Sequence, residues 1–124
     1  MNKLIEIRSY NLKEGCRDEF HRLVTEESLP LLKQWHVDVV AFGPSPHDDI
    51  SYYLIRAYTN LADRQSSQDA FYGSADWREG PRAAIVALIE SDTSIVIEMD
   101  ALAVNALRQN SGVSSHGEPA VVQL

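Results

Sequence analysis

The sequence contains a single cysteine, Cys16, so the chain cannot form an internal disulfide. It also lacks long apolar runs: residues 83–89 form one of the longest, far short of the roughly 20 residues that cross a bilayer. Basic residues are scarce, with 11 Lys and Arg against 18 Asp and Glu, and the net charge is −7. Because phosphate backbones and anionic lipids are bound by clusters of basic residues, we expect neither nucleic acid nor a membrane as a partner.

The opening residues, MNKLIEIRSY, alternate polar and apolar side chains and resemble neither a signal peptide nor a transit peptide. Together with the single cysteine, this pattern predicts a soluble, cytoplasmic protein. A length of 124 residues is typical of one domain, and a hydrophobic content of 44% is ordinary for a globular chain.

The spacing of apolar residues changes between the period of a strand and that of a helix along the chain. The segment 4–10, LIEIRSY, alternates as a strand does, whereas Cys16, Phe20, Leu23 and Val24 have helical spacing. The predicted elements, in order, are a strand at 4–10, a helix at about 14–28, strands at 37–43 and 50–58, helical segments at about 61–72 and 81–90, and a strand at 93–99.

This βαββαβ order predicts a ferredoxin-like α+β fold, in which a four-stranded antiparallel sheet carries its helices on one face. Residues 1–100 form the predicted domain, and residues 101–124 form a C-terminal tail. Because the tail contains NSGVSSHGEP, with little periodicity, we expect a short ordered piece followed by disorder.

Each clearly alternating strand has one plainly apolar face and one mixed face. We expect the apolar faces to pack against the helices; they consist of Ile5, Ile7, Tyr53, Ile55, Ala57, Ile95, Ile97 and Met99. The mixed faces then form a second surface, in which Leu4, Tyr10, Tyr52, Leu54, Tyr58 and Val96 surround Glu6, Arg8, Arg56 and Glu98. Such a patch indicates an interface or a ligand cleft. A solvated face with snorkelling arginines and a set of buried, hydrogen-bonded ion pairs are the alternatives.

Several short motifs resemble the NIPSNAP family in both order and spacing. The family pattern has an ELRxY strand, an LKxG turn, a helix that ends near PL, a YxxLxxR run and a downstream tryptophan. This chain has EIRSY at 6–10, LKEG at 12–15, then Phe20, Pro30 and Leu31, YTNLADR at 58–64, and Trp77. The resemblance covers roughly residues 4–98. The chain departs from the family pattern at Trp35 and His36, where a glycine is common, and at Leu54 and Arg56, where His and Trp are common.

The resemblance implies a dimeric α+β barrel, in which the sheets of two protomers pack face to face, and hence a homodimer. Related proteins hold small ligands between sheet and helices or at the barrel centre. The implied function is to bind or transform a small, partly aromatic organic molecule without a tightly bound cofactor. As an enzyme, the protein would be a cofactor-independent monooxygenase or isomerase. The alternative is a non-catalytic dimeric protein-interaction module.

Within this interpretation, Tyr10, Arg56 and Tyr58 are the candidate catalytic residues. A tyrosine can donate a hydrogen bond or a proton, and an arginine can hold a carboxylate or enolate oxygen. The candidate ligand-binding residues are Glu6, Arg8, His21, Trp77 and Glu98. A buried polar network that fixes the barrel explains the charged residues equally well, and a partly exposed helix position is the commoner outcome for a histidine such as His21.

No metal or cofactor is predicted. His47, Asp48 and Asp49 offer hard ligands in a row, but adjacent loop residues seldom converge on one ion without further donors. The sequence contains no glycine-rich phosphate loop, zinc pattern or nucleophile elbow. Cys16 fits a small core residue, and His36 fits the end of a helix.

Overall fold

The structure is a computed structural model that describes residues 1–109. It contains a four-stranded antiparallel sheet with the strand order β2-β3-β1-β4. The elements, in chain order, are β1 (Asn2–Leu12), α1 (Arg17–Leu23), the π-helical turn η1 (Val24–Ser28), α2 (Leu29–Gln34), β2 (Asp38–Pro44), β3 (Ser51–Tyr58), α3 (Leu61–Tyr72), α4 (Ala75–Arg78), α5 (Arg82–Val86), β4 (Ile89–Asp100) and α6 (Ala101–Gln109). The predicted ferredoxin-like α+β fold is confirmed.

The first helical region runs to Gln34, because α1, η1 and α2 follow one another without a break. Pro30 does not end it: the π-helical turn η1 directly precedes this residue, and the N–H of Leu29 donates to the Val24 carbonyl five residues earlier. His36 ends it instead, with φ at 59° in the left-handed region. The N–H of His36 donates to the Lys33 carbonyl at 3.0 Å and that of Val37 to the Leu32 carbonyl at 2.9 Å, which is a Schellman motif.

The strand register confirms which side chains share a face of the sheet. Glu6 lies opposite Arg56 and Tyr10 lies opposite Tyr52. On the other face, Ile7 lies between Ile55 of β3 and Ile95 of β4.

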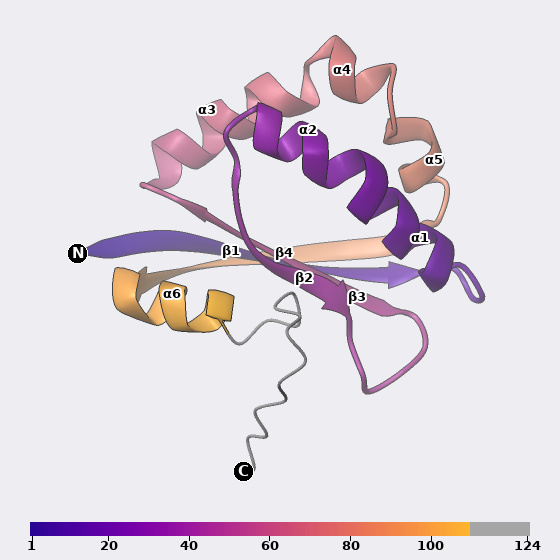
Figure 1. Cartoon of the computed structure of the whole chain (residues 1–124), viewed down its shortest axis with the longest axis horizontal. Coiled ribbons are helices and arrows are strands. Elements are labelled where there is room, and N and C mark those ends of the chain that lie inside the picture. The colour runs from indigo at the N-terminus through magenta and orange to yellow at the C-terminus, as the bar shows by residue number, and fades with distance from the viewer. Residues whose placement is uncertain (110–124) are drawn as a thin grey trace.

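The expected orientation of the sheet is wrong: α1 to α5 cover the mixed face, not the apolar one. The main core cluster joins Tyr10, Tyr52 and Leu54 of the sheet to helix residues such as Phe20 and Phe71. Figure 1 shows α1 to α5 together on one side of the sheet and α6 on the other. A charged face can pack beneath helices only when its charges find partners there, and α3 supplies partners for Glu6 and Arg56.

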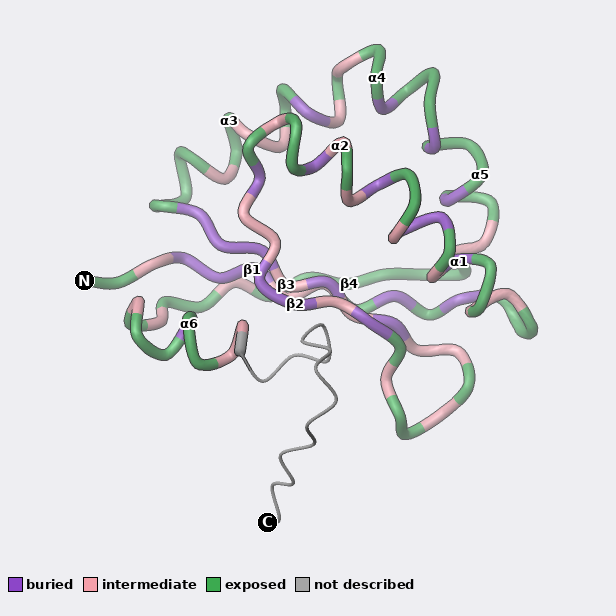
Figure 2. Tube along the Cα trace, in the orientation of Figure 1, coloured by how far each residue is buried: buried purple, intermediate pink, exposed green. Residues whose placement is uncertain are grey.

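The apolar face of the sheet is only partly covered. Val104 of α6 packs there against Ile5, Val40, Ala41 and Ala57. Further along, the side chains of Ile95 and Ile97 on β4 are 59% and 37% exposed. Figure 2 shows that much of β4 is exposed, whereas β1 and β3 contain most of the buried residues of the sheet. Four isoleucines of this face are half-buried or exposed, and we call them the open apolar patch: Ile7, Ile55, Ile95 and Ile97.

The predicted C-terminal tail begins with α6, an ordered helix. Residues 110–124, for which disorder is expected, lie outside the described part of the chain. The division into a domain of residues 1–100 and a tail stays a prediction. Within residues 1–109, no helix is both long enough and apolar enough to span a membrane.

Candidate functional site

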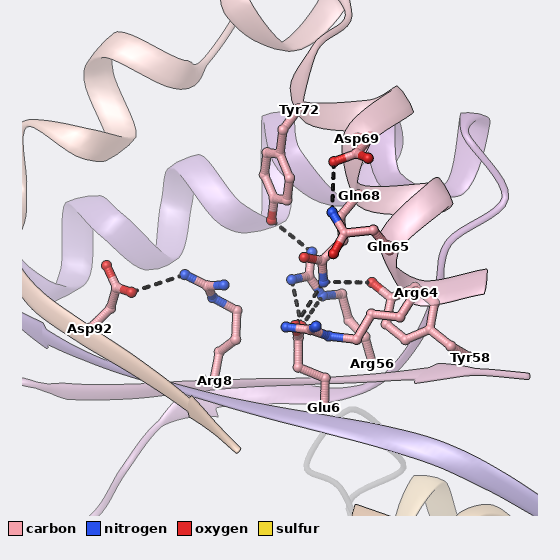
Figure 3. Close-up of polar contacts among 10 residues, drawn as sticks. All are labelled: Glu6, Arg8, Arg56, Tyr58, Arg64, Gln65, Gln68, Asp69, Tyr72 and Asp92. Atoms are coloured by element: carbon pink, nitrogen blue, oxygen red, sulfur yellow. Dashed lines mark hydrogen bonds and ion pairs between the residues drawn. The ribbon is translucent and has the colours of Figure 1, made fainter. Parts of the chain in front are cut away.

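Glu6 is the centre of a buried polar network between the sheet and α3 (Figure 3). Glu6 and Arg56 are 0% and 1% exposed. Arg56 donates from Nε and Nη2 to Oε1 of Glu6, at 2.9 and 2.6 Å. We call this cluster the Glu6 network; its members are Glu6, Arg56, Tyr58, Arg64, Gln68 and Tyr72.

Helix α3 completes the Glu6 network. Arg64 Nε and Gln68 Nε2 donate to the second carboxylate oxygen, Oε2, at 2.9 and 2.7 Å. The hydroxyl of Tyr72 accepts from Arg56 Nη1 at 2.7 Å. Arg64, Gln68 and Tyr72 are spaced by four residues and therefore lie on one face of the helix. None of these three residues is among the site residues predicted from the sequence, and their spacing is the signal that would have found them.

The contacts of Glu6 explain how its charge is kept in the interior. Burial alone would raise its pKa, but the charge of Arg56 and the hydrogen bonds from Gln68, Arg56 and Arg64 hold the pKa below its ordinary value of 4.5. Glu6 is therefore ionised at neutral pH. Arg56 directs all three of its nitrogens at Glu6 and Tyr72, as expected of a residue in a buried polar network that fixes the fold. A catalytic role for Arg56 stays a prediction.

An internal cavity of about 40 Å³ lies between the sheet and the helices. Its walls are mainly aromatic and aliphatic and include Tyr10, Phe20, Tyr52, Leu54, Trp77 and Ile85. Val24 and Ser28, the two ends of the π-helical turn η1, also line it. Such turns are frequent at functional sites in other proteins.

The tyrosines of this region carry their protons at neutral pH. Burial raises the pKa of Tyr10, of Tyr52 and of Tyr58, so each phenol can donate a hydrogen bond but does not act as a base. The hydroxyl of Tyr52 lies 2.6 Å from Nδ1 of His21, a half-buried residue of α1. This contact joins α1 to the cavity wall. Tyr58 belongs to the Glu6 network, where its hydroxyl accepts from Gln68 at 3.3 Å.

Arg8 stands apart from the Glu6 network. Its Nη2 donates to Asp92 at 3.0 Å, and its guanidinium carbon lies 5.4 Å from the ring centre of Tyr10, a cavity residue. Its Nε is buried and has no hydrogen-bond partner in the described part of the chain. Burial alone would lower the pKa of Arg8, but Tyr10, Tyr72 and Glu6 act in the opposite direction, and the pKa is raised. Arg8 is therefore a charged donor with an unused N–H.

The remaining two predicted residues lie in different places. Trp77 lines the cavity and packs against Phe71 and Tyr72, with ring centres 5.4 and 5.5 Å apart. Glu98 is exposed on β4 and lines a separate surface groove with Leu4. Of the predicted residues, Tyr10 and Trp77 therefore line the cavity, and His21 contacts the lining residue Tyr52. Glu98 lies elsewhere. Among residues 1–109, no three potential His, Cys, Asp or Glu ligands lie together.

Solved structures show which proteins share this fold, and they include several NIPSNAP proteins. A NIPSNAP family protein of unknown function from Agrobacterium tumefaciens is 23% identical, with a TM-score of 0.72 over 78% of this chain and 87% of its own. An uncharacterized NIPSNAP domain protein from Burkholderia xenovorans is 20% identical, with a TM-score of 0.71 over 79% of this chain and 95% of its own. At the level of the fold, the predicted resemblance to NIPSNAP proteins is confirmed.

A more distant similarity connects the fold with a second group. A candidate antibiotic biosynthesis monooxygenase from Nitrosomonas europaea is 13% identical, with a TM-score of 0.59 over 80% of this chain and 91% of its own. No family model and no curated protein matches the sequence.

Proposed function

We propose that the protein binds a small, partly aromatic organic molecule in the cavity between its sheet and its helices, without a tightly bound cofactor. The observation that carries this proposal is the lining of the cavity, which combines aromatic walls with the protonated phenols of Tyr10 and Tyr52. Apolar walls with a few oriented polar groups are characteristic of small-molecule sites.

The volume of the cavity limits the ligand. Pockets for drug-sized molecules measure about 300–1,000 Å³, whereas this one measures about 40 Å³. A larger ligand enters only if part of the wall moves. The wall at Trp77 and Ile85 is formed by α4 and α5, helices of four and five residues that are the best candidates to move. A reaction at this site would be of the cofactor-independent monooxygenase or isomerase type, with a tyrosine as proton donor.

Filling the cavity tests this proposal. Ile85→Phe adds volume at a cavity wall, whereas Val86→Phe makes a comparable change at the next residue, which is 45% exposed and does not line the cavity. Calorimetry with small aromatic probes such as benzoate and benzamide is expected to show binding to the wild type and to Val86→Phe, with loss in Ile85→Phe. Circular dichroism checks that both variants fold. Equal binding by all three proteins would place the ligand elsewhere.

We also propose that the protein is a homodimer whose copies meet through the open apolar patch. The patch bears no charge, and Ile7, Ile55 and Ile95 lie side by side across three strands. Because the chain carries a net charge of −7, two copies repel each other where charged surfaces meet, and an uncharged face is where they can pack. A dimer without any cavity ligand would support the alternative of a non-catalytic interaction module.

We place the protein in the cytoplasm, a compartment in which free thiols persist. The support for this proposal is that Cys16, the one cysteine of the chain, is unpaired and half-buried.

A further inference from the structure

We propose that Arg8 is the anchor of the cavity ligand and that the ligand is a small monocarboxylic acid, with its carboxylate on Arg8 and its apolar tail in the cavity. This inference rests on the proposed function, since it names the chemical class of the molecule that the cavity binds.

Arg8 differs from Arg56 and Arg64, the two arginines bound to Glu6, in how its nitrogens are used. Arg56 directs Nε, Nη1 and Nη2 at Glu6 and Tyr72. Arg64 directs Nε and Nη2 at Glu6, at 2.9 and 2.7 Å. Arg8 differs, because its Nε is buried without a partner among residues 1–109. A buried N–H that lacks an acceptor is costly, so a ligand oxygen that reaches it gains affinity.

The ion pairs around Arg8 and Glu6 leave an excess of one positive charge. Arg8, Arg56 and Arg64 carry three positive charges, whereas Glu6 and Asp92 carry two negative ones. The side chain of Asp92 is 40% exposed, and it meets only Arg8 among the residues drawn in Figure 3. One bound carboxylate would balance the charges, and a monoanion suits this excess better than a phosphate group does.

Arg8 lies next to residues that line the cavity. Its guanidinium lies over the ring of Tyr10, and both Tyr10 and Tyr72 line the cavity. The fork formed by Nε and Nη2 matches the two oxygens of a carboxylate, and Asp92 competes with the ligand for Nη2. A carboxylate held there leaves the rest of the molecule directed past these two rings toward Trp77 and Ile85, where the walls are apolar.

The test uses two acids, benzoate and crotonate, and their neutral amides, benzamide and crotonamide, titrated into the full-length protein. The wild type is expected to bind each acid more tightly than its amide. Arg8→Gln should weaken acid binding by about tenfold or more and abolish this preference, while amide binding changes little. Arg22→Gln removes the same charge from an exposed position on α1 and should leave all affinities unchanged.

A second variant keeps Arg8 in place. Asp92→Asn removes the carboxylate that occupies Nη2 of Arg8, so the affinity for both acids should rise several-fold while amide affinity stays constant. If Arg8 and Asp92 formed only a structural pair, this variant would lose stability without an acid-specific effect, and the inference would be overturned.

The outcomes separate this inference from the proposed function. Acids and amides that bind alike, and that are equally unaffected by Arg8→Gln, would overturn the anchor but leave the cavity as a binding site. Absence of binding by all four probes would overturn both proposals. An acid preference that is lost in Arg8→Gln and retained in Arg22→Gln supports the anchor.

Discussion

Glu6 on β1 and Arg56 on the neighbouring strand β3 form a buried ion pair, in which one oxygen of Glu6 accepts two hydrogen bonds of 2.9 and 2.6 Å. Arg64 of α3 binds the other oxygen at 2.9 Å. The pair therefore ties the centre of the sheet to the helix that covers it. It also explains how a charged strand face can lie in the interior.

Replacing Glu6 with glutamine should strongly destabilise the fold. The change leaves Arg56 and Arg64 without their counter-charge, and removal of one partner from a buried pair costs about 3–5 kcal/mol. Urea unfolding measures the free energy of unfolding. Glu19→Gln, which removes an exposed carboxylate on α1, is the control and should have little effect. A loss below about 1 kcal/mol in Glu6→Gln would show that the network contributes little.

The loss of stability in Glu6→Gln should depend on pH. Because the folded-state pKa of Glu6 is below its ordinary value of 4.5, its ionised form stabilises the fold above that pH, and this contribution disappears as the pH falls through the folded-state pKa. The wild type and Glu6→Gln should differ most near pH 7 and converge as the pH falls below 4.5. Urea unfolding at a series of pH values measures this difference. A difference that stays constant with pH would contradict the assignment of the charge to Glu6.

Alternation along the strands was sufficient to predict which residues share a face. Glu6, Arg8 and Tyr10 lie together, and Ile5 and Ile7 lie on the other face, as the period of two residues requires. The order of the elements and the fold class followed from the same periodicity.

The side of the sheet that the helices cover was not predictable from the strands alone. Hydrophobicity favours burying the isoleucine face, because a charged face is costly to bury unless it finds partners. Those partners, Arg64, Gln68 and Tyr72, come from a helix distant in sequence, and they become visible only when the helix is placed over Glu6. The N–H of Arg8 that has no partner among residues 1–109 likewise depends on geometry that spacing does not contain.

The open apolar patch predicts how a substitution would change the oligomeric state. Ile95→Glu places a carboxylate on both sides of the proposed interface, because a two-fold dimer pairs the same patch with itself. Sedimentation at several concentrations is expected to show a dimer for the wild type and a monomer for this variant. Val86→Glu introduces the same charge at an exposed residue of α5 and should remain dimeric. A wild type that stays monomeric at every concentration, or an Ile95→Glu variant that still dimerises, would contradict this interface.

The most direct measurement follows the indole N–H signals of the two tryptophans by NMR while benzoate is added to the full-length protein. Trp77 lines the cavity, whereas Trp35 does not, and the indole of Trp35 donates to Asp76 at 3.2 Å. Trp35→Phe assigns the two signals. Binding in the cavity predicts a saturable shift of the Trp77 signal that exceeds any change at Trp35. A Trp77 signal that does not move at saturating benzoate, or a shift confined to Trp35, would contradict a ligand site between the sheet and the helices.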